Sequence, residues 1–132
     1  MDHGRRRHPT AEWLSRYRMI AVEIEAKQEQ LRQLPRVPML SDTVAETELL
    51  LLEGIDVLAS EQLKIRRVIA GVENCDWRNV LEFRYINGWS WGRIAEKMNY
   101  ERTSVWRIHK KAINSICLPE SCNTMQHSDV VT

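Results

Sequence analysis

A cluster of side chains that can pair with nucleic-acid bases lies between residues 102 and 107. Arg102 and Arg107 carry planar guanidinium groups, which form paired hydrogen bonds with phosphate or with the edge of guanine. Thr103 offers a hydroxyl and a methyl group, and Trp106 a large apolar ring. We therefore predict that Arg102, Thr103, Trp106 and Arg107 read base sequence in double-stranded DNA.

Positive charge is concentrated in the same part of the chain. The whole chain of 132 residues has a net charge of only +1, but residues 78–112 contain eight Lys and Arg against three Asp and Glu, a balance of +5. A local basic face is what contact with the phosphate backbone requires. We predict phosphate contacts from four further side chains: Arg93, His109, Lys110 and Lys111.

The residues around this cluster have the spacing of a helix-turn-helix at about residues 90–116. Ser90 can cap a first helix, and Asn99 tolerates the left-handed conformation of a tight turn. A small residue where two helices cross, a turn residue four positions later and aliphatic residues beyond it are typical of this motif. Its predicted core comprises Ile94, Ala95, Met98, Asn99, Val105 and Ile108.

Two longer helices must precede this module and position it. Apolar residues recur at steps of three and four from Tyr17 to Leu34 and again from Leu51 to Val72, which predicts two amphipathic helices. The first seam is interrupted at Lys27, and Gly54 lies within the second helix. Pro35 and the proline at 38 end the first helix. We expect an all-α chain: a long antiparallel helical hairpin, then a three-helix module that ends in the helix-turn-helix.

These patterns divide the chain into four predicted parts. They are a disordered basic N-terminus over 1–9, a hairpin for interaction or oligomerisation over 10–73, the DNA-binding module over 74–118, and a disordered tail over 119–132. Thr10 is the expected cap of the first helix, and Asn74 or Asp76 that of the third. The third helix is expected to end at Asn87 and the glycine after it.

Several other classes of function are not indicated. His109, Cys117 and Cys122 have no zinc-binding spacing and lack a fourth ligand, so neither a metal site nor a cofactor is expected. No catalytic triad pattern or phosphate-binding glycine loop is present, which argues against an enzyme. The sequence contains no run of 18 apolar residues, so no membrane span is expected. An odd number of cysteines without a Cys-x-x-Cys pair predicts free thiols and a cytoplasmic protein.

Three short stretches resemble a known group of regulators. They are Arg84-Tyr85-Ile86-Asn87-Gly88, Ser90-Trp91-Gly92-Arg93-Ile94-Ala95 and Arg107-Ile108-His109. Together they resemble the sigma-70 region 4 helix-turn-helix and, more closely, phage and prophage regulators similar to the RinA and ArpU late-gene activators. The resemblance covers about residues 74–116. It implies DNA binding with the second helix of the motif in the major groove, and contact with RNA polymerase. Glu101 departs from the pattern, because a Ser or Thr cap is usual there.

The favoured expectation is a sequence-specific transcription regulator that binds double-stranded DNA and controls late genes in a phage or prophage. One alternative is a DNA-packaging protein of the small-terminase kind, which also joins a helix-turn-helix to oligomerising helices. Another is a helical protein-interaction module that does not use its helix-turn-helix on DNA. The second long helix is expected to carry more apolar surface than one short partner helix can cover, which predicts a homodimer through the hairpin.

Overall fold

The described part of the structure, a computed structural model, covers residues 8–35 and 41–118, and its regular secondary structure is all helical. The helices are α1 (Pro9–Arg32), α2 (Ser41–Ala70), α3 (Cys75–Leu81), α4 (Trp91–Met98) and α5 (Arg102–Ser115). A short π-helix, η3 (Glu82–Ile86), continues α3. These ranges contain no strand, so the all-α prediction is confirmed. The predictions for residues 1–7 and 119–132 lie outside the described residues.

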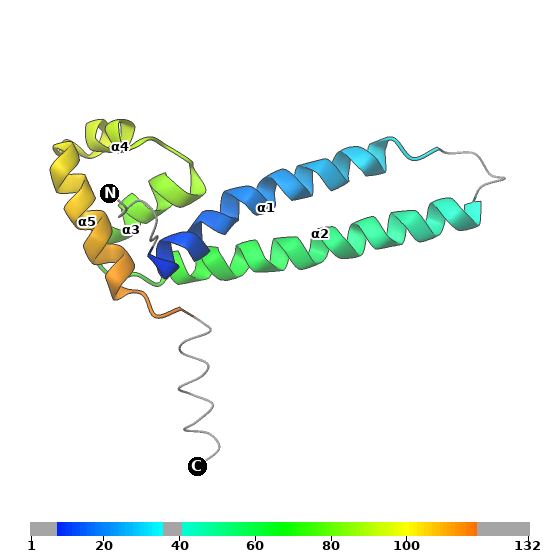
Figure 1. Cartoon of the computed structure of the whole chain (residues 1–132), viewed down its shortest axis with the longest axis horizontal. Coiled ribbons are helices and arrows are strands. Elements are labelled where there is room, and N and C mark those ends of the chain that lie inside the picture. The colour runs from blue at the N-terminus through cyan, green and yellow to red at the C-terminus, as the bar shows by residue number, and fades with distance from the viewer. Residues whose placement is uncertain (1–7, 36–40, 119–132) are drawn as a thin grey trace, which may run out of the picture.

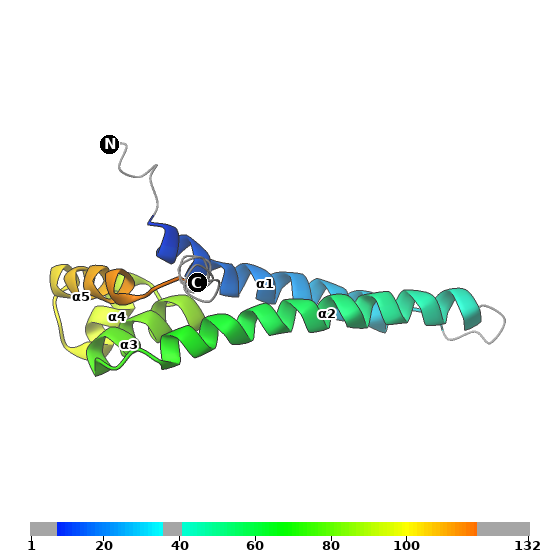
Figure 2. The same cartoon turned by 90° about the horizontal axis from the view of Figure 1, so that it is seen from below.

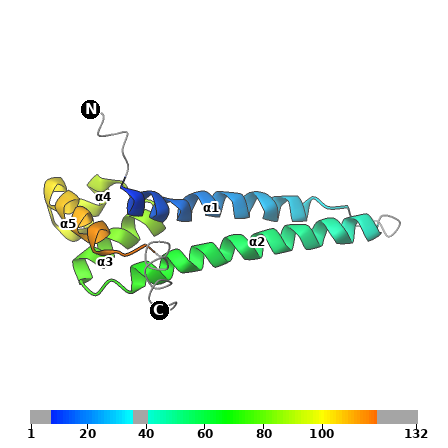
Figure 3. The same cartoon turned by 60° about the horizontal axis from the view of Figure 1, so that its bottom comes forward.

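Helices α1 and α2 run antiparallel, side by side, and project away from the cluster formed by α3, α4 and α5 (Figure 1). The same arrangement is seen from below in Figure 2 and from an intermediate direction in Figure 3. Ile20 and Leu51 are buried between the two helices. Polar contacts add to the pairing, because Gln62 donates from Nε2 to the carbonyl of Tyr17 at 3.1 Å and Arg66 donates to the Tyr17 hydroxyl at 2.8 Å. The predicted seam residues are all buried or partly buried.

The two irregular positions of the predicted seams lie opposite each other. A methyl group added at Gly54 would lie 3.1 Å from Cε of Lys27, so the absence of a side chain at Gly54 leaves room for the Lys27 chain. The aliphatic part of a lysine can pack on an apolar surface while its ammonium group reaches water. The interruption at Lys27 and the glycine in α2 are therefore two halves of one packing arrangement.

The first helix begins differently from the prediction. His8, rather than Thr10, is the N-cap, and its Nδ1 accepts a hydrogen bond from the backbone N–H of Thr10 at 3.1 Å. Pro9 occupies the first helical position, where a missing N–H costs nothing. Thr10 is buried, and Nε2 of His8 lies 2.9 Å from the side-chain oxygen of Asn114 on α5. The start of α1 is thus attached to the end of α5.

One buried cluster joins the base of the helical pair to the rest of the chain. Leu14 from α1 packs with Ile65 and Ile69 from α2, and the same cluster includes Leu81 at the end of α3. Helix α5 contributes Ala112, which is completely buried, and its neighbour at 113. The parts expected at 10–73 and 74–118 therefore share a core. Among the described residues, no helix has the combination of length and apolar character that a membrane span requires.

Candidate nucleic-acid interface

The turn between α4 and α5 has the local structure that its residues favour. The Ser90 hydroxyl accepts a hydrogen bond from the N–H of Arg93 at 3.2 Å, which caps α4 as predicted. Asn99 ends α4 with φ 61° and ψ 42°, the left-handed conformation expected for this position. The Tyr100 N–H then bonds to the carbonyl of Ala95 at 3.0 Å, and its hydroxyl donates to Asp76 on α3 at 2.8 Å. These contacts fix the direction in which α5 leaves the turn.

A small apolar cluster holds α5 across α4 and α3. Val80, Ile94 and Val105 are fully buried, and Ala95 is buried beside them. The remaining predicted core side chains, Met98 and Ile108, are partly buried and pack against this cluster. The cluster fixes which face of α5 points away from the protein.

The outward face of α5 carries the side chains that the sequence predicts there. Helical period places them on one half of the cylinder, because Val105 and Ala112 define the other half. All six are exposed: Arg102, Thr103, Trp106, Arg107, Lys110 and Lys111. On α4, Arg93 is exposed as well, and its guanidinium lies 4.0 Å from the ring centroid of Trp89. Seven of the eight side chains predicted to contact DNA are thus accessible from outside.

His109 is the exception, and its predicted role as a phosphate contact is wrong. It follows Val105 by four residues, so it lies on the inward face and is only 3% exposed. Its Nε2 lies 2.7 Å from the Tyr85 hydroxyl on η3. Burial, with smaller contributions from the positive charges of Arg84 and His8, lowers the pKa of His109 from 6.5 to about 4. His109 is therefore a neutral packing residue at pH 7.

Tryptophan and arginine side chains surround His109 and support the outward face from behind. The Trp106 ring stacks on His109 with a centroid distance of 5.2 Å. Trp91 meets Trp106 edge-on at 5.3 Å, and the guanidinium of Arg84 lies 4.3 Å from the Trp91 ring centroid. The Arg102 side chain lies over Gly92, because a Cβ added at Gly92 would lie 2.7 Å from a guanidinium nitrogen, so any side chain there would require the guanidinium to shift. The first turn of α4 thus contacts the first turns of α5 through Trp91 and Gly92.

The sequence interpretation missed the part that η3 plays in this packing. The π-helix carries Arg84 and Tyr85 toward α4 and α5, where they contact Trp91 and His109. A local π-helix has no signal in apolar periodicity, so it was not predictable from spacing. The inward position of His109 did have a signal, which was its four-residue step from Val105. Glu101 precedes α5 without a side-chain capping bond, consistent with its departure from the usual pattern.

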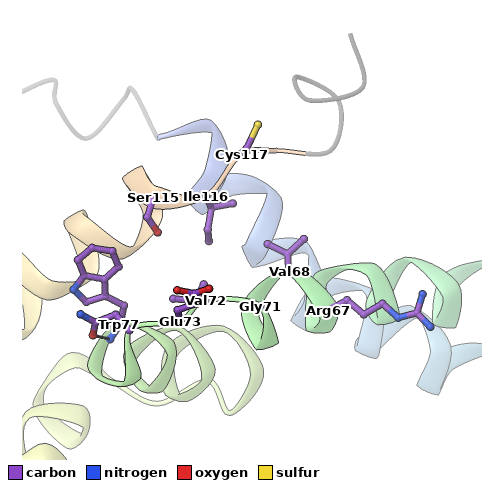
Figure 4. A pocket seen from close by; sticks show the side chains of 10 residues that line it. Arg67, Val68, Gly71, Val72, Glu73, Trp77, Ser115, Ile116 and Cys117 are labelled. Atoms are coloured by element: carbon purple, nitrogen blue, oxygen red, sulfur yellow. Dashed lines mark hydrogen bonds between the residues drawn. The ribbon is translucent and has the colours of Figure 1, made fainter. Parts of the chain in front are cut away.

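A hollow of about 560 Å³ lies at the C-terminal end of α5, where α2 ends and α3 begins (Figure 4). Its walls include Arg67, Trp77 and Cys117. Cys117 is disulfide-bonded, so the prediction of three free thiols is wrong there, whereas Cys75 is free and exposed. Within residues 8–35 and 41–118, no three His, Cys, Asp or Glu side chains gather into a group that could hold a metal ion.

Comparison with known proteins places most of this structure in one family. The family described as "Protein of unknown function (DUF1492)" matches residues 41–116, which span α2 to α5. The chain belongs to the DUF1492 family. No curated protein and no solved structure matches the chain significantly. The DUF1492 match includes α5 and the helices α3 and α4 that pack against it, but not α1.

Proposed function

We propose that this DUF1492 chain binds double-stranded DNA in a sequence-specific manner and regulates transcription, with α5 lying in the major groove. The observation that carries the proposal is the outward face of α5. It exposes Arg102, Arg107, Lys110 and Lys111, and none of the 14 residues of α5 is acidic. A helix of this length with cationic and hydrogen-bonding side chains on one face suits the width of the major groove.

The resemblance to sigma-70 region 4 and to phage late-gene activators supports a more specific version of this proposal. In that version the chain activates late genes of a phage or prophage and contacts RNA polymerase. The exposed positions divide by their place on the helix. Arg102, Thr103, Trp106 and Arg107 lie in the first turns of α5 and would face base edges, whereas Lys110 and Lys111 lie one turn further along and would hold phosphates.

The proposal predicts that DNA affinity falls steeply as salt rises. Each phosphate neutralised by a cationic side chain contributes a slope of about −0.9 in the logarithm of affinity against the logarithm of salt concentration. Fluorescence anisotropy with the full chain and a labelled duplex, at several salt concentrations, measures the slope. Lys111→Ala should reduce its magnitude by about one and weaken preferred and random duplexes alike. Lys64→Ala removes an exposed lysine from α2 and should leave the slope unchanged.

Within the same experiment, Arg107→Ala distinguishes reading of sequence from attraction to charge. It should weaken binding to the preferred site by about 1–3 kcal/mol and binding to random duplex much less. The preferred site comes from selection out of a random duplex pool. A flat salt response, or no duplex binding at low salt, rules out DNA binding. That outcome would favour the alternative of a protein-interaction module.

We also propose that the distal half of the α1–α2 pair joins two copies of the chain. Two helices alone cannot enclose a core, and large apolar side chains there remain exposed. They include Val22 on α1 and Leu49, Leu50 and Leu52 on α2, and exposed Met19 and Val57 lie just on the other side of the two helix midpoints. Leu50 is 65% exposed although it lies in the middle of an apolar run. A second pair of helices packed against these residues would complete a four-helix bundle.

Sedimentation of the full chain at micromolar concentrations tests this association. We expect a dimer that Leu50→Glu converts to a monomer, since an unpaired carboxylate would be buried in the contact. Glu48→Lys, which changes a charge at an exposed neighbouring position, is the matched control. A monomer at high micromolar concentration contradicts the proposal. A larger closed ring would instead favour the DNA-packaging alternative.

A further inference from the structure

An apolar hollow lies over the first two turns of α5, on its outward face. It has a volume of about 480 Å³ and is lined by Trp91, Arg102, Thr103, Trp106 and Arg107. The indole rings of Trp91 and Trp106 come from different helices and meet edge-on at 5.3 Å. Trp106 keeps 47% of its surface exposed. A large apolar surface surrounded by cationic groups therefore faces outward.

The exposed indole is held in place by its neighbours. His109 stacks against Trp106 at 5.2 Å and also contacts Trp91 at 4.7 Å. Arg84 covers Trp91 with its guanidinium 4.3 Å from the ring centroid. The rings are therefore arranged before any ligand arrives, and binding does not have to order them first. Trp106 therefore differs from an ordinary surface tryptophan, whose side chain changes rotamer freely.

The charges around the hollow select the kind of ligand that would cover it. Arg102 and Arg107 line the hollow, and Lys110 lies one turn beyond it on the same helix, so the complementary ligand is polyanionic. It must also offer an apolar group at the depth of the tryptophan rings. Among the base edges of the major groove, the C5 methyl of thymine is the apolar group. Duplex DNA that carries thymine at this point satisfies both requirements.

We propose that the hollow formed by Trp91 and Trp106 reads the C5 methyl group of a thymine in the DNA site. The inference rests on the proposed function, because it assumes that α5 lies in the major groove. It assigns Trp106 the apolar contact, Trp91 the role of holding that ring, and Arg107 the neighbouring base pair. Specificity would then combine a hydrogen-bonded contact with an adjacent methyl contact.

The experiment replaces each thymine of the selected site in turn by deoxyuridine, which removes the methyl group alone. At one or two positions, the affinity of the full wild-type chain should fall about fourfold, the effect of withdrawing one methyl-sized group from an apolar contact. Trp106→Ala should abolish this sensitivity. The two changes together should therefore weaken binding by less than the product of their separate fold-changes in affinity. Thr103→Ala is the matched control, because Thr103 also has a methyl group beside the hollow. This variant should retain the sensitivity to deoxyuridine, since the inference assigns the methyl contact to Trp106.

Two results would overturn the inference while leaving the proposed function intact. One is a specific site at which no deoxyuridine replacement changes the wild-type affinity. The other is a 2-aminopurine signal showing that a base leaves the stack and enters the hollow. If the chain binds no duplex at any salt concentration, the inference and the proposed function fail together. The wild-type deoxyuridine series needs no variant, so the result stands even if Trp106→Ala fails to fold, which circular dichroism would reveal.

Discussion

Val105→Asp is expected to abolish cooperative folding of the chain at pH 7. Val105 is fully buried against Val80 and Ile94, and none of the described side chains of this cluster is cationic. Burial of an unpaired charge costs several kcal/mol, which is comparable with the whole stability of a small domain. Circular dichroism with urea unfolding measures the loss.

Thr103→Asp is the matched control, because it introduces the same charge two residues away on the exposed face. It lies in the first turn of α5, where a negative charge is favourable to the helix, so folding should be retained. Under the proposed function it should nevertheless weaken DNA binding, since a carboxylate would approach phosphate. A Val105→Asp variant that unfolds at the same urea concentration as wild type would show that the buried cluster is not as described.

The second large effect is an expected loss of folding stability at acidic pH, caused by His109. His109 has a pKa of about 4 in the folded chain, below the ordinary 6.5 that it regains on unfolding. Between these values the unfolded chain binds more protons than the folded chain, so stability falls as the pH falls. The contribution of His109 is complete above pH 6.5, is lost as the pH approaches 4, and amounts to about 3 kcal/mol. Urea unfolding at pH 7 and pH 4 would measure it.

His109→Gln isolates this contribution from that of the carboxylates. Glutamine does not titrate in this range, and its amide can still pair with the Tyr85 hydroxyl that lies 2.7 Å from His109 in the wild type. The variant is expected to be less stable than wild type at pH 7, and the gap should narrow by about 3 kcal/mol at pH 4. Equal pH dependence of the two proteins would mean that His109 is not buried in neutral form.

The local elements of the fold were predictable because their signals are local. Apolar spacing placed Ile94 and Val105 inside, and the conformational tolerance of asparagine placed Asn99 at the turn with φ 61°. The capping of α4 by Ser90 likewise depends on one side chain and the next backbone N–H groups. Such features need no knowledge of distant parts of the chain.

What the sequence interpretation missed depends on contacts between distant residues. His109 is neutral and buried because η3 and α4 cover it, and the pairing of Lys27 with Gly54 joins positions in different helices. The capping residue His8 is hydrogen-bonded to Asn114, which lies 106 residues further along the chain. The hollow beside Trp106 was also beyond sequence reasoning, since Trp91 reaches it from another helix. Each of these depends on tertiary contacts, although the inward position of His109 also follows from its four-residue step from Val105.

The length of the helical pair determines how far apart two α5 helices lie in a dimer joined through the distal halves. Helix α2 has 30 residues and is about 45 Å long, while one turn of duplex DNA measures about 34–36 Å. Its far end points away from α5 (Figure 1). Two copies joined through their distal halves would hold their α5 helices at opposite ends of the assembly. The two half-sites on DNA would then be separated by more than one turn. The distance between the half-sites of the operator would therefore depend on the length of α2.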